Sequence, residues 1–262
     1  MEFKIYQVDS FTSEVFGGNP ACVVPLESWL DDSVLLKIAR ENSVAETAFF
    51  IASGDRYRIR WFTPDIEMDL CGHATLAAAH VLKKYHKLDS KVIQFESNSG
   101  ILTVTCQSEC YTLDLPSRMP VAAILPEIIE NGIEPQPREV FKARDYMLMY
   151  DKEEDITNIK LNRQILDQIN LDPGGIIITA PGNMVDFVSR YFTTQSTIFE
   201  DPVTGSAHCS LIPFWSKRLN KNEMTARQLS SRGGELVCVN ADSRVLITGN
   251  AKTYMEGVIL IQ

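Results

Sequence analysis

The feature that most constrains the fold of this chain is an internal duplication. The segment RWFTPDIEMDLCGHATLAAAHVL, which begins at Arg60, is repeated in outline by RYFTTQSTIFEDPVTGSAHCSLIPFW, which begins at Arg190. Similarity at one long spacing is the mark of a repeated structural unit. The length of 262 residues suits two lobes of about 130 residues each. Three pairs of residues keep the spacing in chain order: Phe62 with Phe192, Gly72 with Gly205, and Gly100 with Gly234.

Each copy contains strand-like segments and one apolar helix. Alternating segments such as FKIYQVDSF and RYRIRWFT predict strands. Residues 74–85 have few polar side chains before Lys83, and a helix that is apolar nearly all round must be buried. A similar segment follows Gly205 in the second copy. We therefore predict an α+β fold with two pseudo-symmetric lobes.

The boundary between the lobes is expected close to residue 116. Two prolines interrupt the strand pattern between Leu115 and Ala123. This assigns residues 1–116 to the N-terminal lobe and residues 117–252 to the C-terminal lobe. The closing segment YMEGVILIQ reads as a strand that can pair with either lobe, and we assign residues 253–262 to the N-terminal one.

The composition argues against several classes of function. The net charge is −9 and the pI is about 5.0, whereas contacts to nucleic-acid phosphates need clustered Lys and Arg. No apolar run reaches the roughly 18 residues of a membrane-spanning helix, and the first residues lack the pattern of a secretion signal. Six scattered cysteines then predict free thiols in a reducing cytoplasm. We expect a cytoplasmic protein that binds neither nucleic acid nor membrane.

Each apolar helix begins directly after a glycine, Gly72 in the first copy and Gly205 in the second. The first turn of such a helix presents free backbone N–H groups and the positive end of the helix dipole, which suit a carboxylate. His73 and Ser206 follow the two glycines at matching positions. This symmetric placement indicates a shared site between the lobes for a small anionic substrate.

Asp201 also precedes the second helix, with a near-match in Asp69 before the first. Taken singly, Asp201, Ser206 and His73 are each explained as well by a helix cap, a turn or an exposed position. Only their joint placement favours a functional site, and the residues alone leave both explanations open.

Glu46 is a further candidate, because it lies in the otherwise apolar segment SVAETAFFI. A poorly solvated carboxylate has a raised pKa, in the range that suits a general acid or base. A glutamate without a chemical role at a loop–strand junction is the alternative. Ala45, directly before it, is a candidate substrate contact.

Other known motifs do not account for these residues. Cys71 and His73 offer two kinds of metal ligand, but no second pair at zinc spacing accompanies them, so we predict no metal site. Glycine-rich nucleotide-binding motifs are missing from the sequence. The segment TGSAH is not the GxSxG of serine hydrolases. Ser206 and His208, two positions apart in one helical turn, point to different faces.

Four segments together resemble one protein family. They are DSFTSEVFGGNPACVV, NSVAETAFF, RWFTPDIEMDLCGHATLAAAHVL and EDPVTGSAHCSL, and the closing GNAKTYMEGVILI fits as well. In this order, and over essentially the whole chain, the sequence resembles the phenazine-biosynthesis PhzF-like proteins of the diaminopimelate epimerase fold superfamily. No phenazine pathway follows from the family name.

The resemblance implies a β-barrel-like sheet around a central helix in each lobe. It also implies a homodimeric isomerase that needs no cofactor and moves a proton on a small carboxylic acid in the cleft between the lobes. A single glutamate acts as acid and base, and helix-end N–H groups hold the substrate carboxylate. The implied catalytic residues are Glu46, His73 and Asp201, and the implied substrate-binding residues are Ala45, Gly72, Gly205 and Ser206.

The diaminopimelate epimerases use a pair of cysteines as base and acid. We do not expect Cys71 and Cys209 to restore that pair, because Cys71 precedes the helix start and Cys209 lies one turn inside its helix. His80 and His208, also inside the helices, are expected to serve packing. The alternative function is a non-catalytic small-molecule-binding or stress-linked protein that keeps the pocket without turnover.

Overall fold

The computed structural model describes residues 1–172 and 174–261 and divides into two compact units. Unit 1 comprises Met1–Leu115 and Leu246–Gln262, and unit 2 comprises Pro116–Val245. The chain returns to unit 1 at Leu246, earlier than the expected residue 253, because the last strand pairs first with the strand Cys110–Pro116 and then, from Ala251, with the first strand. Within the described residues, the helices are too short or too polar to span a membrane.

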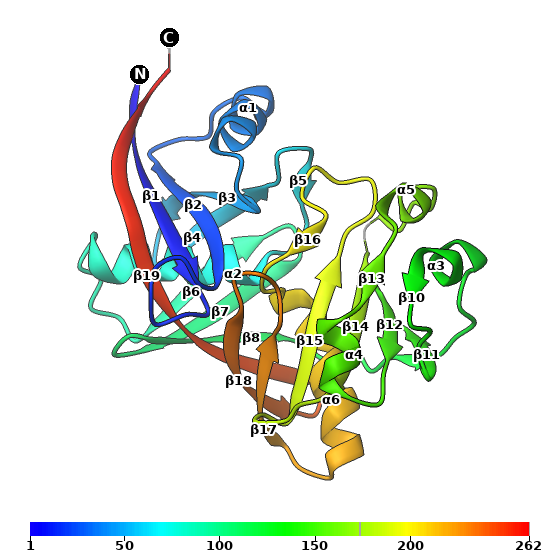
Figure 1. The fold of residues 1–262 in the computed structure, drawn as a ribbon. Helices are drawn as coiled ribbons and strands as arrows, with labels where there is room; N and C mark the ends of the chain where they lie inside the picture. The colour runs from blue at the N-terminus through cyan, green and yellow to red at the C-terminus, as the bar shows by residue number, and fades with distance from the viewer. Residues whose placement is uncertain (173, 262) are drawn as a thin grey trace. The chain divides into compact units, whose positions relative to one another are not determined.

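Unit 1 is a closed barrel of eight strands. Around the ring, β1 is followed by β2, β3, β4, β6, β7, β8 and β19, which pairs with β1 again. Figure 1 shows β19 in red beside β1 in dark blue. The elements are β1 (Glu2–Ser10), β2 (Asn19–Leu26), α1 (Asp32–Asn42), β3 (Glu46–Ser53), β4 (Arg56–Phe62), β5 (Glu67–Met68), α2 (Gly72–Lys84), β6 (Val92–Ser97), β7 (Gly100–Gln107), β8 (Cys110–Pro116) and β19 (Arg244–Leu260).

The central helix of unit 1 is α2. Every residue from Gly72 to Leu82 is buried, and the helix packs against β1, β2, β3 and β7. Its alanines allow the strands to approach closely, and alanine is also the best helix former. Lys83 and Lys84 end the apolar stretch and complement the negative end of the helix dipole.

Unit 2 is built around α6 in a similar way. Its strands β9, β11, β12, β14, β15, β17 and β18 are hydrogen-bonded in that order. Trp215 of α6 stacks on Phe187 of β15 and donates its indole N–H to Thr179 Oγ1 at 2.9 Å. The elements are β9 (Val121–Ala122), α3 (Glu127–Gly132), β10 (Ile133–Glu134), β11 (Glu139–Lys142), β12 (Tyr146–Met149), α4 (Glu153–Thr157), β13 (Lys160–Leu161), α5 (Arg163–Leu166), β14 (Ile176–Pro181), β15 (Phe187–Phe192), β16 (Glu200–Asp201), α6 (Gly205–Leu219), β17 (Glu223–Gln228) and β18 (Gly234–Ala241).

The strand topology confirms the duplication read from the sequence. In unit 1, the parallel pairs are β2 with β3 and β4 with β6. In unit 2, they are β12 with β14 and β15 with β17. A two-residue strand precedes the central helix in both copies, and the predicted α+β class is correct. The register places Asp201 opposite Tyr191 and Met68 opposite Trp61, so the partner of Asp201 in the first copy is Met68 rather than Asp69.

Candidate active site

Two of the three predicted catalytic residues meet in unit 1. Glu46 is the first residue of β3, and His73 is the second residue of α2. Oε2 of Glu46 lies 3.1 Å from Nε2 of His73, and the two side chains are only 13% and 3% exposed. The separation is that of an ion pair, although its angles fall short of a straight hydrogen bond. The fold thus joins a carboxylate and an imidazole at the start of the central helix.

The other ring nitrogen of His73 faces two further side chains. Nδ1 lies 3.1 Å from Nδ2 of Asn19 and 3.6 Å from Sγ of Cys71. The hydroxyl of Ser10 donates to the backbone oxygen of His73 at 2.9 Å. Asn19 and Ser10 are fully buried and face each other across β1 and β2. Neither residue was predicted from the sequence, and the available signal was a polar residue in a strand whose other buried side chains are mostly apolar.

The charges of this cluster depend on one another. Burial lowers the pKa of His73, but negative charge on Cys71 and Glu46 outweighs burial and leaves that pKa well above its ordinary value. Burial raises the pKa of the Cys71 thiol to about 11. The thiol is therefore uncharged at neutral pH. An uncharged thiol is a poor base, which agrees with the expectation that Cys71 does not act as one.

The same three side chains are close enough together to be considered as metal ligands. One ligand atom from each of Glu46, Cys71 and His73 lies within 4.8 Å of the others. The imidazole ring, however, lies between the other two groups, with Nδ1 toward the thiol and Nε2 toward the carboxylate. A metal ion takes one nitrogen of a ring, so these groups do not converge on a single point. The arrangement suits proton transfer better than metal binding.

Of the other predicted residues, Gly72 and Ala45 lie in unit 1, directly before His73 and Glu46, whereas Asp201, Gly205 and Ser206 lie together in unit 2. Asp201 and Gly205 flank the turn into α6, and Ser206 lies in the first turn of this helix. The hydroxyl of Thr204, the residue before the helix, donates to Oδ2 of Asp201 at 2.5 Å rather than capping the helix. The N–H groups of the first helical turn are therefore not satisfied by that side chain.

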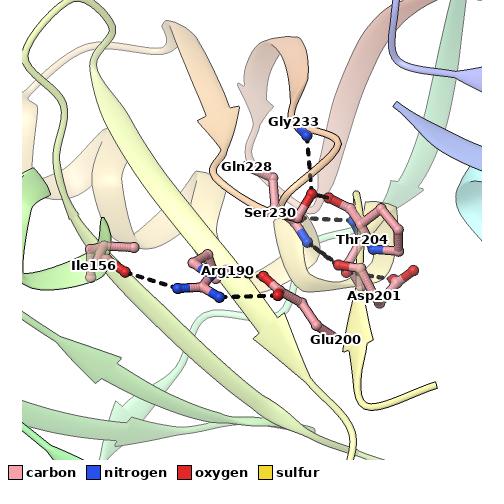
Figure 2. A network of polar contacts seen from close by, with 9 residues as sticks. Ile156, Arg190, Glu200, Asp201, Thr204, Gln228, Ser230 and Gly233 are labelled. Atoms are coloured by element: carbon pink, nitrogen blue, oxygen red, sulfur yellow. Dashed lines mark hydrogen bonds and ion pairs between the residues drawn. The ribbon is translucent and has the colours of Figure 1, made fainter. Parts of the chain in front are cut away.

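Gln228 of β17 holds this turn in place (Figure 2). Its Nε2 donates to the backbone oxygen of Asp201 at 2.7 Å, and its Oε1 accepts from the backbone N–H of Thr204 at 2.8 Å. Ser230 adds a hydrogen bond to the backbone oxygen of Pro202 at 2.9 Å. Gln228 is 1% exposed and was not predicted from the sequence. Its amide fixes both the start of α6 and the backbone that carries Asp201.

Each copy also has an arginine that forms a bidentate ion pair with the glutamate of its two-residue strand. Arg190 binds Glu200 through two nitrogens at 2.7 and 3.0 Å, as Figure 2 shows. Arg60 binds Glu67 in the same way at 2.7 and 2.6 Å. Two-pronged pairs of this kind are among the stronger hydrogen-bonded ion pairs in proteins. They anchor the segments from which both central helices start.

The packing roles expected for two histidines are confirmed. His208 is fully buried, and its Nδ1 donates to the backbone oxygen of Thr204 at 2.8 Å. His80 lies between the hydroxyls of Tyr111 and Thr253 at 3.0 and 2.9 Å. The position of His208 removes it as a base for Ser206. Cys209 is buried within α6, as expected.

Comparison with known proteins shows which family and which solved structures this chain resembles. A model of the phenazine biosynthesis-like protein family, PhzC-PhzF, matches residues 8–257. An uncharacterized isomerase of Pseudomonas aeruginosa is 43% identical over 261 residues, which cover 99% of each chain. The crystal structure of a PhzF-family protein from Enterococcus faecalis has a TM-score of 0.93 at 44% identity, with both chains fully covered. A hydroxyproline epimerase from Agrobacterium vitis, 10% identical, shares the fold with a TM-score of 0.65 over 98% of this chain and 92% of its own.

The duplicated fold is the one found in a predicted epimerase of Pseudomonas aeruginosa and in the hydroxyproline epimerase, so the protein has the epimerase fold. The names of the similar proteins support an isomerase function. Since a family model matches nearly the whole chain, the protein belongs to the phenazine biosynthesis-like family. The resemblance read from the four sequence segments is thereby confirmed.

Proposed function

We propose that this protein is a cofactor-independent isomerase that moves a proton within a small carboxylic acid. The observation that carries the proposal is the buried contact between Glu46 and His73. A carboxylate that is 13% exposed and held beside an imidazole is suited to accept and return a proton. A single acid/base group is enough when the proton leaves and returns on the same face of the substrate.

In the proposed reaction, Glu46 takes a proton from an activated carbon of the substrate. The electron pair of the broken C–H bond stays in the substrate, delocalised toward its carboxylate. Glu46 then returns a proton to another position of the substrate; in a share of turnovers its carboxyl proton first exchanges with solvent, so that solvent deuterium enters the substrate. Nothing is oxidised or reduced overall, so the step needs neither an electron acceptor nor a donor.

The substrate carboxylate is proposed to bind at the helix starts. The N–H groups at Gly72 and His73, and those at Gly205 and Ser206, present positive dipole ends that stabilise negative charge. Each well-placed donor is worth roughly 3–4 kcal/mol when charge develops in the transition state. The proposal requires both helix starts to serve one substrate molecule in the expected cleft, with Asp201 and Ala45 orienting it. We also propose the homodimer that the family implies, which sedimentation of the purified chain tests.

The role of Glu46 is tested with the variant Glu46→Gln, which keeps the shape of the side chain and removes its basicity. A thermal-shift screen of small cyclic and amino carboxylic acids first identifies a ligand. Incorporation of solvent deuterium into that ligand then reports proton transfer. We expect the exchange rate to fall by roughly 10²- to 10⁴-fold. Glu41→Gln, an exposed neighbour on α1, is the matched control and should leave the rate unchanged.

Full exchange by a folded Glu46→Gln protein would show that another group moves the proton. Ligand binding with neither deuterium exchange nor an isomerised product in the unaltered protein would instead support the alternative, a binding protein that has lost turnover. Binding and deuterium exchange are both measured on one sample of each protein, so the two outcomes can be told apart.

A further inference from the structure

The imidazole of His73 is held from the side opposite Glu46 by Asn19. The amide nitrogen of Asn19, rather than its oxygen, faces Nδ1 at 3.1 Å. An amide N–H is only a donor, so the nitrogen that it faces must accept. Cys71 also faces Nδ1, and its thiol, uncharged because its pKa is about 11, is a weak donor. Two donors at Nδ1 leave the ring proton on Nε2, which faces Glu46.

Asn19 is itself rigidly placed. It is the first residue of β2, fully buried, and it pairs with Ser10 of β1. The hydroxyl of Ser10 in turn donates to the backbone oxygen of His73, so both residues of this pair contact the same histidine. The preceding Gly18 has φ of +62°, and a Cβ on it would lie 2.1 Å from the backbone oxygen of Ser10. The close packing of β1 against β2 at Gly18 therefore fixes the position of Asn19 beside His73.

We propose that Asn19 is a positioning residue for the acid/base pair, because it makes Nδ1 the nitrogen of His73 that loses its proton. Nε2 then keeps its proton, directed at Glu46, in both protonation states of the ring.

This assignment rests on the proposed reaction and gives Glu46 and His73 different roles in it. A histidine with a permanent proton on Nε2, the nitrogen 3.1 Å from Oε2 of Glu46, has no free electron pair on that nitrogen and cannot take a proton from the carboxylate. Glu46 therefore carries the substrate proton by itself, and His73 orients and stabilises the carboxylate. The relay in which Glu46 passes its proton to His73 is excluded by this tautomer.

The test is a nitrogen NMR measurement on the full chain labelled with ¹⁵N-histidine. Long-range ¹H–¹⁵N correlation spectra show which nitrogen carries the proton, and a pH series reaching above the pKa of His73 shows the neutral ring. His73→Gln identifies the signal by its disappearance. We expect the neutral His73 to carry its proton on Nε2. His208, whose Nδ1 donates to Thr204, should show the opposite tautomer and is the internal reference.

Variants at position 19 then test the cause. Asn19→Leu removes the donor, and the neutral ring should become a mixture of both tautomers. Asn19→Asp offers only an acceptor, and the proton should move to Nδ1. Ser10→Ala, which loses only the contact to the backbone of His73, is the matched control and should keep the proton on Nε2.

A proton on Nδ1 in the unaltered protein would overturn the proposal, as would an unchanged tautomer in Asn19→Leu. If Asn19→Leu does not fold, the unaltered protein and Asn19→Asp decide the question. The experiment needs no substrate, so its result is independent of the deuterium-exchange test of Glu46. Failure of one does not imply failure of the other.

Discussion

The carboxylate of Glu46 depends for its chemistry on residues of other elements. Its neighbour His73 belongs to the central helix, and the group that orients His73, Asn19, belongs to the barrel wall. Charge, tautomer and position are thus set by three side chains that are distant in sequence. At the scale of single residues, the candidate site consists of successive contacts, from Glu46 to His73 and from His73 to Asn19, rather than of one reactive group.

Gln228 shows a comparable dependence in unit 2. Replacement by alanine would leave the backbone oxygen of Asp201 and the N–H of Thr204 buried without this partner. A buried polar group that loses its partner costs about 1–3 kcal/mol. We therefore expect Gln228→Ala to lower the free energy of unfolding by about 2–4 kcal/mol, measured by urea titration. Gln168→Ala removes an exposed amide and should change it little, and equal losses in both variants would contradict the role of Gln228.

At the scale of elements, the turns that introduce the strands and helices decide where the polar groups lie. The two-residue strands β5 and β16 each carry a glutamate bound by an arginine, just before a central helix begins. The turn into β2 places Asn19 beside His73. These short segments matter more to the site than the long strands, because they determine the orientation of the helix starts.

Two glycines with the same backbone conformation allow this to be tested. Gly18 and Gly54 have φ of +62° and +64°, but only at Gly18 would a Cβ collide with the backbone. Both alanine variants bear the cost of a left-handed residue, about 1–2 kcal/mol. Gly18→Ala must also push β1 and β2 apart, and we expect a clearly larger loss of stability together with a disturbed His73 signal. Equal effects in thermal unfolding would show that the contact with Ser10 is not limiting.

At the scale of the whole molecule, each unit buries a histidine in its central helix. Burial lowers the pKa of His80 and of His208 to about 4. An unfolded histidine has a pKa near 6.5, so the unfolded chain binds more protons below that value. The stability that comes from these two groups is therefore complete above about pH 6.5 and is lost as the pH falls toward 4.

We expect each of these histidines to contribute about 3 kcal/mol to the fall in stability on acidification. His208→Asn keeps an N–H donor for Thr204 and removes the titration. Urea unfolding between pH 7 and 4 should show a shallower dependence for this variant than for the unaltered protein. His86→Gln alters an exposed histidine and should leave the slope unchanged. A slope unaffected by His208→Asn would contradict the buried neutral state.

Much of the fold could be predicted from local pattern. The duplication, the two apolar helices and their glycine starts all depend on residues close together in sequence, whose spacing directly reflects helical and strand geometry. Glu46 and His73 were likewise found as candidates, and the structure brings them together. The contacts of Asn19 and Gln228 were not predictable, since they depend on the register between strands and helices far apart in the chain.

The sequence by itself determined that this chain is a doubled α+β unit with polar groups at two buried helix starts. Burial of an all-round apolar helix leaves few other solutions, and this follows from composition and period alone. Only the tertiary structure decided that the last strand closes the first barrel and that His73 lies between a carboxylate and an amide. Those contacts join segments that are far apart in the sequence, and the spacing of residues within one segment does not determine which other segment it contacts.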